Sequence, residues 1–451
     1  MDAPTTDPNL LNRPGDIVIE SVNLLIPSAA AGKPEEISLK DFIYSVEIYE
    51  DIFSNSLSGS IVFGDALALK NHYIIMGNES IRITFYTPGQ ENQRQNKIEL
   101  VFRVYKSHST EASDKAKITT IEFVSEEFFF NTTTKFSTAY KQKSYSDMAS
   151  QIFDQHIWKA KQNDKNYLNK TAKFWVPVPS EGTNKSVVFP WWSPFYAINW
   201  LANKSFSSIK ENKCADYLFF QHLNGTYVFA PLSYFKGLPK TATYRQIPTD
   251  KQRDKTMFDN ITELTVISSN DKMQDVATGV YGSILNTFDI HNKKMEGSIF
   301  DYYKEFSSSQ HINKHPLVSP NTHLYGNPLA YKKILPKNSN RFSGIPDNEE
   351  HEKYALLRQS SMNQMNCITL QLKVPGDSRR RVGDIVELKI TSPEDISKKT
   401  QQNEDFGMDR YLSGLYMITK INHSFFHQDY DLILTVTKDS YGSPITEKTN
   451  G

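Results

Sequence analysis

The chain has 451 residues, which is enough for several hydrophobic cores and suggests about three domains. Its 51 Lys and Arg residues balance 51 Asp and Glu residues, and this zero net charge argues against a general nucleic-acid-binding protein, which needs a basic excess. The 23 Tyr and 27 Phe residues favour β structure and surfaces that pack against other subunits.

The N-terminal residues lack a charged segment followed by an apolar one, so we expect no signal peptide. No apolar run approaches the roughly 20 residues that span a bilayer, so we expect no membrane-spanning segment. The two cysteines, Cys214 and Cys367, lie far apart and lack metal-ligand spacing. We therefore expect no disulfide framework and a reducing compartment.

Residues 1–15 are polar, contain three prolines and are predicted to form a loose arm. Residues 16–140 have the pattern of a β-domain. In the segment 41–50, side chains alternate so that Phe42, Tyr44, Val46 and Ile48 share one face. Further strands are predicted at residues 60–63, 81–86, 98–105 and 118–124. About six strands at this spacing indicate a compact barrel or sandwich.

Helix signals distinguish the middle region, residues 141–258. Ser144 with Asp147 three positions later forms a capping pattern, and Ser193 followed by Pro194 is typical of a second helix start. Asn224-Gly225, between two apolar segments, predicts a hairpin. The middle region is therefore predicted to be an α+β domain.

β structure returns after the middle region. The predicted second β-barrel domain comprises residues 259–305 and 364–440, with strands at 261–267, 280–290, 367–374, 385–390, 412–422 and 432–438. Between these two parts, residues 306–363 are predicted to form a long surface loop, 306–346, and a helix from about residue 347 to 362. Residues 441–451 are predicted to be a C-terminal tail.

A short echo links the two β-domains. Gly59-Ser60-Ile61-Val62 in the first is matched by Gly282-Ser283-Ile284-Leu285 in the second. This match is compatible with a duplicated β module, although four residues are few enough to match by chance.

Three stretches follow one another in a recognisable order. They are Tyr49 to Leu67 with Ile75 to Ile83; Trp192 to Ala202; and Pro375 to Leu388 with Tyr411 to Ile418, His423 and Lys438-Asp439-Ser440. Together they resemble the baseplate hub subunit of T-even-type contractile-tailed phages, a hub family shared with secretion-system spike hubs.

The resemblance implies an α+β, β-dominated fold with two tail-tube-like β-barrel domains and an intervening α+β domain. It also implies a homotrimeric ring with pseudo-sixfold symmetry, because two equivalent modules in each of three chains make six positions. Such a ring would join the cell-puncturing spike to the tail tube, and pairing between subunits would hide edge strands.

The partners implied by the resemblance are further copies of the chain, the central spike protein, the tail tube or tube-initiator protein and the baseplate wedge proteins. The tape measure or DNA in the lumen are further candidates. The expected location is the tail baseplate of the virion, assembled in the host bacterial cytoplasm.

Histidines are the first candidates for a reactive site. His311 and His315 have the spacing of a metal pair on a helix, with His351 further on, but their segment is polar and loop-like, which favours solvated histidines. His423 and His427 flank a turn-like segment, where we expect His423 to make a structural hydrogen bond. We therefore expect no metal site.

Glu126-Glu127 could form an acid–base pair, but adjacent strand residues face opposite sides, which favours a turn at the end of a strand. Trp191-Trp192, after Phe189-Pro190, could stack on a sugar or nucleotide. Anchoring of the following helix, or a subunit interface, is the favoured role.

The run Arg379-Arg380-Arg381 could contact DNA in a lumen or an acidic partner, although a solvated turn is favoured. The chain also lacks a Gly-x-Ser-x-Gly elbow, a P-loop and a His-Glu-x-x-His motif. We therefore expect a structural, non-enzymatic subunit without catalytic or cofactor-binding residues. Two alternatives stay open: a tail-associated cell-wall or glycan hydrolase, which a muralytic assay would reveal, and the hub of a contractile secretion or tailocin system.

Overall fold

The computed structural model describes residues 13–27, 35–64, 77–88, 97–113, 116–159, 162, 173–182, 185–209, 212–246, 258–269, 271–290, 292–319, 327–337, 350–392, 408–426 and 429–444. The arm up to residue 12, His427 and residues 445–451 lie outside these described residues. Strands dominate the structure, as predicted for a β-dominated α+β fold. Among the described residues, no helix is long and apolar enough to cross a bilayer.

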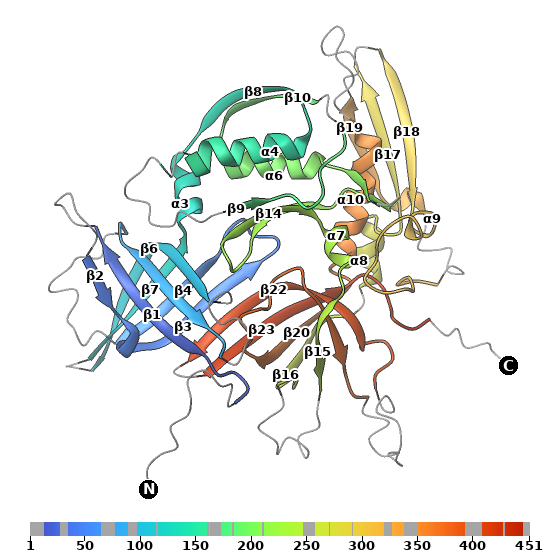
Figure 1. The fold of residues 1–451 in the computed structure, drawn as a ribbon. Helices are drawn as coiled ribbons and strands as arrows, with labels where there is room; N and C mark the ends of the chain where they lie inside the picture. Colours follow the sequence, from blue (N-terminus) through green and yellow to red (C-terminus); the bar gives the residue numbers. More distant parts are fainter. Residues whose placement is uncertain are drawn as a thin grey trace, which may run out of the picture.

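One large sheet contains strands from both ends of the chain (Figure 1). Its order is β16-β20-β23-β22-β3-β4-β7-β6-β5-β1-β2, with β21 beside β22 and β15 beside β21. The strands are β1 (Val18–Ile26), β2 (Glu35–Ser38), β3 (Ile43–Asp51), β4 (Ser58–Gly64), β5 (Ser80–Tyr86), β6 (Ile98–Ser113), β7 (Ala116–Ser125), β15 (Lys240–Arg245), β16 (Glu263–Ser268), β20 (Ile368–Pro375), β21 (Ile385–Lys389), β22 (Gly414–Phe426) and β23 (Asp429–Lys438).

The pairing of β22 with β3 joins the N-terminal and C-terminal strands into one sheet, with Phe426 opposite Ser45 and Lys420 opposite Asp51. All pairs in the sheet are antiparallel except β15 with β21. Alternating burial along β3 buries Val46, Ile48 and Glu50, so the predicted period-two pattern is confirmed there.

The sheet does not close into a barrel within the described residues. β2 pairs only with β1, and β16 pairs only with β20. Two isolated bridges, Asp16 with Asp429 and Arg245 with Asn260, link strands at the margins of each half. The two barrels expected from the resemblance are therefore, in this structure, two parts of one open sheet.

The middle region is a layered α+β unit beside this sheet. Figure 1 shows helices α4 (Tyr145–Phe153) and α6 (Pro194–Lys204) side by side, with the β8–β10 ribbon on one face and β13 and β14 on the other. The remaining elements are α3 (Glu126–Thr133), β8 (Phe136–Lys143), a π-helical turn (Asp154–Trp158), β9 (Lys173–Trp175), β10 (Lys185–Trp192), β11 (Ser207–Ile209), β12 (Asn212–Cys214), β13 (Tyr217–Gln221), β14 (Thr226–Pro231) and α7 (Leu232–Lys236).

Three local predictions for this region are confirmed. The Ser144 hydroxyl accepts a hydrogen bond from the Asp147 backbone N–H at 3.1 Å and caps α4. Pro194 begins α6. The turn between β13 and β14 contains Gly225 at φ 79°, which glycine adopts without the steric penalty of a side chain.

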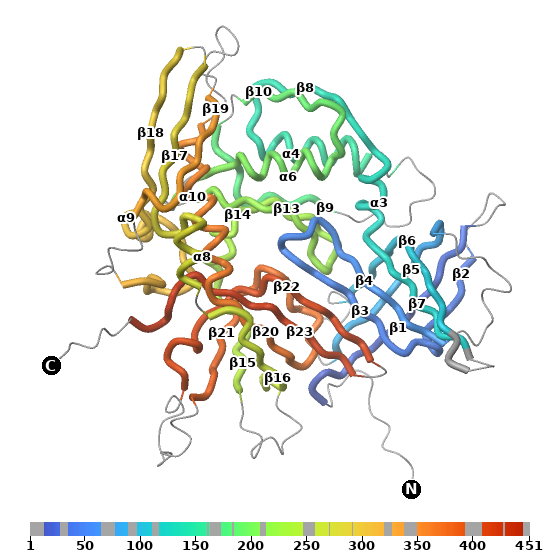
Figure 2. The backbone as a smooth tube through the Cα atoms, turned by 180° about the vertical axis from the view of Figure 1, so that it is seen from behind, coloured from blue at the N-terminus to red at the C-terminus, as the bar shows by residue number. Residues whose placement is uncertain are grey.

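A separate three-stranded sheet lies at the side of the molecule away from β1–β7 (Figures 1 and 2). It contains β18 (Lys294–Asp301), β17 (Gly282–Asp289) and β19 (Lys332–Lys337), and it is accompanied by α8 (Lys272–Ala277), α9 (Tyr302–Phe306) and α10 (His351–Gln364). Two short 3-10 turns complete the described elements, Lys40–Phe42 and Pro328–Ala330.

This sheet corrects two expectations. The prediction of a surface loop throughout 306–346 is wrong for residues 332–337, which form β19 parallel to β17. The echo of Gly59-Ser60-Ile61-Val62 lies in β17, outside the large sheet that contains β4, so the two segments do not occupy equivalent strands of one sheet. The predicted start of the following helix near residue 347 lies outside the described residues, and α10 begins at His351.

Candidate functional site

The end strands of the large sheet, β2, β15 and β16, are candidate assembly edges, and β16 is the most exposed in its middle. In β16, Thr265, Val266 and Ile267 are all exposed, to 45% for Val266 and 57% for Ile267. The Thr262 backbone N–H donates to the Lys373 carbonyl at 2.9 Å, so Lys373 of β20 faces β16. Gln371, two residues earlier and opposite Thr265, faces β16 as well, whereas Leu370 faces away from it, so alternation turns the N–H of Val266, opposite Leu370, away from β20. An outward row of N–H and C=O groups is a template for pairing with another chain.

A buried ionic cluster around Glu50 lies where β3, the β13–β14 turn and β22 meet. Glu50 Oε1 accepts a hydrogen bond from the Leu223 backbone N–H at 3.1 Å and lies 3.0 Å from His222 Nδ1. His423 Nε2 lies 3.7 Å from Glu50 Oε2, and its Nδ1 is hydrogen-bonded to the Tyr430 hydroxyl at 2.8 Å, which confirms the structural hydrogen bond predicted for His423. The cluster therefore ties three parts of the chain together.

The Glu50 carboxylate is stabilised in its charged form. Burial alone would raise the pKa of Glu50, but the hydrogen bonds and charges of His222 and His423 outweigh burial and lower that pKa to about 2. Because the folded pKa lies below the ordinary value of about 4.3, this group stabilises the fold above roughly pH 4.3, and the contribution is lost as the pH falls toward 2.

The substitution Glu50→Gln is expected to lower the free energy of unfolding at pH 7 by on the order of 3 kcal/mol. The difference from the unmodified chain should shrink as the pH falls from 5 to 3, measured by urea unfolding at each pH. The exposed Glu99→Gln, which removes a surface ion pair with Arg82, is the matched control. A difference that stays constant with pH would contradict the role given to the Glu50 charge.

A second buried ionic cluster joins α7 to the C-terminal end of β23. Lys236 Nζ lies 3.0 Å from Asp439 Oδ2 and 3.9 Å from Asp216 Oδ2, and all three side chains are at most 1% exposed. Asp439 also lies 2.9 Å from His311 Nδ1 and accepts a hydrogen bond from the Ile312 backbone N–H at 3.1 Å. Burial opposes the charge of Asp439, but Lys236 and His311 outweigh it and lower the Asp439 pKa.

Next to this cluster, Lys438 is buried among backbone carbonyls. Its ammonium donates to the carbonyls of Tyr411, Leu412 and Ser413, and it lies 4.5 Å from the centre of the Tyr416 ring. Burial lowers the pKa of Lys438 to about 7. Two segments that carry the hub resemblance, 411–418 and 438–440, are therefore in direct contact.

The structure separates the candidate metal histidines. His311 pairs with Asp439, whereas the His315 backbone pairs with Tyr441. His351 Nδ1 is hydrogen-bonded to the Tyr354 hydroxyl at 2.7 Å. The side chains of His311 and His351 are buried, so the prediction of solvated histidines is wrong for these two.

The prediction that Glu126 and Glu127 lie in a turn is wrong. β7 ends at Ser125, and the two glutamates begin α3 with both side chains buried. Glu126 accepts a hydrogen bond from the Ser80 hydroxyl at 3.4 Å, and Glu127 accepts one from Tyr227 at 3.3 Å. They therefore fasten α3 to two different strands, β5 and β14.

The aromatic segment before α6 divides into buried and exposed residues. Phe189 is buried, and the Trp192 ring packs edge-on against Tyr196 and Trp200 with centroids 4.9 and 5.8 Å apart. Anchoring of the helix is therefore confirmed for Trp192. Trp191 is 72% exposed and points away from this cluster's core.

The arginine run is largely neutralised within its own turn. Arg379 and Arg380 both pair with Asp377, at 3.0 and 3.1 Å, and Arg380 lies 3.9 Å from Asp384. Arg380 is buried rather than solvated, while the Arg381 backbone N–H donates to Asp384 at 3.2 Å. Two of the three charges are thus compensated before any partner binds.

The cysteines and metal-type residues show no reactive arrangement among the described residues. Cys214 and Cys367 are free thiols, and burial raises the pKa of each. No group of three or more His, Cys, Asp or Glu side chains in the described part of the chain is placed to hold a metal ion.

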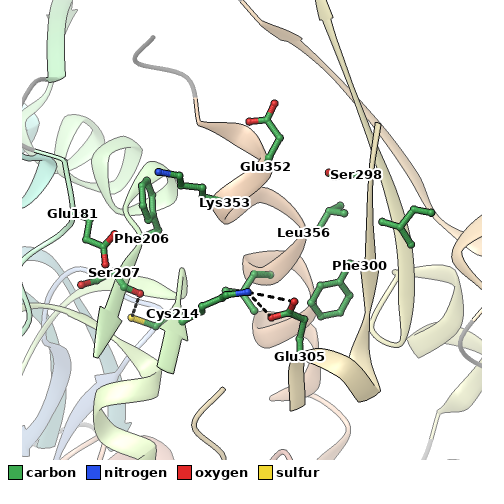
Figure 3. A pocket seen from close by; sticks show the side chains of 13 residues that line it. Glu181, Phe206, Ser207, Cys214, Ser298, Phe300, Glu305, Glu352, Lys353 and Leu356 are labelled. Carbon is green, nitrogen blue, oxygen red and sulfur yellow. Dashed lines mark hydrogen bonds and ion pairs between the residues drawn. The ribbon is translucent and has the colours of Figure 1, made fainter. Parts of the chain in front are cut away.

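A pocket of about 390 Å³ separates the middle region from α10 and β18 (Figure 3). One ion pair spans its wall, with Lys213 3.2 Å from Glu305, and Lys353 lies over the Phe206 ring at 5.2 Å. Cys214 donates to the Ser207 carbonyl inside the same pocket. These contacts indicate a seam between two layers of the fold.

Comparison with known proteins places this geometry among tail proteins. No family model and no curated protein matches the chain in sequence. In structure, the tail protein from Neisseria meningitidis MC58 aligns over 94% of this chain and 99% of that chain, with a TM-score of 0.54 and 11% identity. The 43 kDa tail protein of prophage MuSo2 from Shewanella oneidensis aligns over 93% of this chain and 99% of that chain, with a TM-score of 0.51 and 10% identity.

This chain has the fold of those tail proteins. The match extends over nearly the whole of each chain, so it includes the large sheet, the middle region and the three-stranded sheet. The resemblance drawn from the sequence is thereby confirmed at the level of the fold.

The two buried ionic clusters were not predicted, apart from the hydrogen bond of His423. Their central contacts, Glu50 with His222 and Lys236 with Asp439, join residues more than 100 positions apart, so no local spacing marks them. A signal was present for Glu50, because it continues the buried side of β3 after Val46 and Ile48. A weaker signal was present for Lys236, because it follows the buried Leu232 and Phe235 in a short segment.

Proposed function

We propose that this chain is a structural, non-enzymatic subunit of the central hub of a phage tail baseplate. Three copies would form a ring with pseudo-sixfold symmetry that joins the cell-puncturing spike to the tube of a contractile tail. The observation that carries this proposal is the single sheet that runs through both β regions and has end strands, β2, β15 and β16, that each pair with one neighbouring strand. Pairing of such edges around a closed ring would satisfy them.

The arrangement of the two halves of the sheet supports two tube-like modules per chain. The bridge from Asp16 to Asp429 links the start of β1 to the start of β23, and the bridge from Arg245 to Asn260 links β15 to the segment before β16. The second bridge lies within the C-terminal half, whereas the first joins the two halves, so the N-terminal barrel-like unit would include the start of β23. Two units in each of three chains would match six tube subunits. The domain boundaries predicted from the sequence are part of this proposal.

The partners follow from this position. One rim of the ring would bind the spike, the other the tube or its initiator, and the outside would contact the wedge proteins. Tape measure or DNA would pass through the lumen of the virion tail. Of the arginine run, Arg381 is the residue left to face such a partner, because Arg379 and Arg380 pair with Asp377.

The substitution Val266→Pro tests the edge directly. Proline removes an N–H that points away from β20, so the internal ladder stays intact while pairing with another chain is blocked. We expect the dissociation constant of the trimer to rise by at least about tenfold. Light scattering across a dilution series measures this change.

Val266→Thr is the matched control, since it keeps the N–H and the strand propensity. Circular dichroism should show both variants folded. Equal trimer stability in the two variants would exclude β16 as an assembly edge and remove the main support for the ring.

A further inference from the structure

The three-stranded sheet has one covered face and one bare face. On the covered side, the Ser360 hydroxyl of α10 donates to the Val280 carbonyl at 2.6 Å, and Thr287 donates to Glu352 at 3.3 Å. Burial alternates along all three strands, so every second residue points away from α10. On that outward side, large apolar side chains are exposed on all three strands.

The bare face carries several apolar side chains beside Asn286 and the exposed Lys332. Its large outward side chains are exposed to between 43% and 69%: Phe288, Ile290, Met295, Ile299 and Ile334. A soluble monomer rarely exposes so large a contiguous apolar patch, and such patches mark interaction surfaces. We call these five residues the sheet patch.

Among the residues of the sheet patch lies a position without a side chain, Gly297. Gly297 lies between Met295 and Ile299 on β18, opposite Asn286 of β17, and Asn286 is opposite Ile334 of β19. A Cβ placed on Gly297 would meet only the Asn286 side-chain oxygen, at 3.4 Å. The middle row of the patch is therefore open, and a cross-packed aromatic ring is the usual partner of a glycine in a sheet.

Four large apolar side chains on α3, β10 and α6 are also exposed. Phe128, Val188, Trp191 and Tyr196 are exposed to 39%, 69%, 72% and 55%. Trp191 has φ 45°, a conformation that is an outlier for so bulky a residue. Strain of this kind is retained where the surrounding structure holds a residue for a function, and here it directs the indole into solvent. We call these four residues the tryptophan patch.

The two patches lie at opposite sides of the molecule. The tryptophan patch adjoins α3, because the Phe195 backbone N–H at the start of α6 donates to Asn131 of α3 at 2.8 Å. Figures 1 and 2 both show α3 on one side and β17, β18 and β19 on the other. A contact between the patches therefore joins two copies head to tail, the type of interface that generates rings.

The size of the patches suits such a contact. From the exposed fractions, each patch offers on the order of 500 Å² of side-chain surface, and the two together reach the roughly 1,000 Å² that separates biological interfaces from incidental ones. A different protein bound at one patch would explain the exposure of that patch alone. A second copy of the chain accounts for both.

We propose that the tryptophan patch of one copy docks on the sheet patch of the next, with Trp191 seated over Gly297. This inference rests on the proposed ring and identifies a contact separate from the β2 and β16 edges. Trp191 would act as the anchor of the interface, in the way that a central aromatic residue dominates many protein contacts.

The test places the photo-crosslinker p-benzoylphenylalanine at position 191 of the full chain and irradiates the purified protein. We expect covalent dimers and trimers on denaturing gels, with adducts mapped by mass spectrometry to residues 282–301 or 332–337. The same probe at Tyr105, which is 51% exposed on β6, should give no adduct in those ranges.

A variant of the sheet patch tests the same contact without the photo-crosslinker. The double substitution Ile299→Lys and Ile334→Lys would bury two charges in the contact, and we expect it to raise the trimer dissociation constant at least about tenfold. Met273→Lys, at a residue 86% exposed on α8, is the matched control and should leave the trimer unchanged.

The outcomes separate this inference from the proposed function. A stable trimer whose probe at position 191 reacts outside the sheet patch, or that tolerates both lysines, overturns the patch contact and leaves the ring intact. An unmodified chain that is monomeric at every concentration overturns both. Adducts in the sheet patch together with weakened trimers in the lysine variant support the contact.

Discussion

Replacing Lys236 with methionine is expected to lower the free energy of unfolding by about 3–5 kcal/mol. Lys236 lies 3.0 Å from Asp439 and 3.9 Å from Asp216, and neither carboxylate is exposed to water. Burial opposes the charge of Lys236, but the two aspartates outweigh burial and raise the pKa of the ammonium. Removing it leaves two carboxylates buried against each other with one fewer counter-charge.

Urea unfolding at pH 7 measures the loss. Lys213→Met is the control, because Lys213 forms an ion pair with Glu305 at 3.2 Å but is 57% exposed, and exposed pairs contribute at most about 1 kcal/mol. A loss below about 1 kcal/mol for Lys236→Met would contradict the view that this cluster holds α7 against the end of β23.

Replacing Gly59 with alanine is expected to cost about 3 kcal/mol or more, because β4 is enclosed on both sides. Gly59 faces Ile48 of β3 and Phe123 of β7. An added Cβ would lie 2.2 Å from the Glu47 carbonyl oxygen and 2.6 Å from the Phe123 ring. The first contact is with backbone, so the strands must move apart.

Thermal unfolding followed by circular dichroism measures this effect, with Gly237→Ala as the control. Gly237 has φ −88° and its added Cβ would make only ordinary contacts at 3.6 Å, so we expect a change within about 1 kcal/mol. Equal stability of the two variants would show that β3, β4 and β7 are packed less closely than the structure has them.

Much of the large sheet could be predicted from the sequence, because half-buried strands leave a period-two pattern. β3, β20 and β23 alternate cleanly, and their predicted ranges were correct to within a few residues. Helices α4 and α6 were predictable because Ser144 and Pro194 mark their starts. In these elements the local sequence and the tertiary environment favour the same structure.

Three of the strands that were missed, β8, β18 and β19, lack that agreement, whereas β1 was missed although its sequence is largely apolar. β19 has the sequence Lys-Lys-Ile-Leu-Pro-Lys, whose lysines and Pro336 suggest a loop; proline is tolerated because β19 is an edge strand. β18 is interrupted by Gly297, and β8 is mostly polar because one of its faces is in water. Tertiary pairing, and not local preference, makes these segments strands.

The same dependence on tertiary pairing explains why the buried ionic clusters could not be predicted. His311 was expected to be solvated because its own segment is polar, but its partner Asp439 lies 128 residues later. Pairing at this separation depends on how β23 returns beside α9, and no local pattern encodes it. The segment Lys438-Asp439-Ser440 was recognised only through its resemblance to tail hubs, and the structure gives it a physical role in both buried contacts of that region.

The central claim is that three copies form a closed ring. The most direct measurement is the mass of the purified chain by light scattering, with negative-stain images of the same fraction. We predict a mass of three chains and a hollow ring with three strong and three weaker lobes. A monomer without a ring, both alone and after co-expression with the spike, would contradict the account.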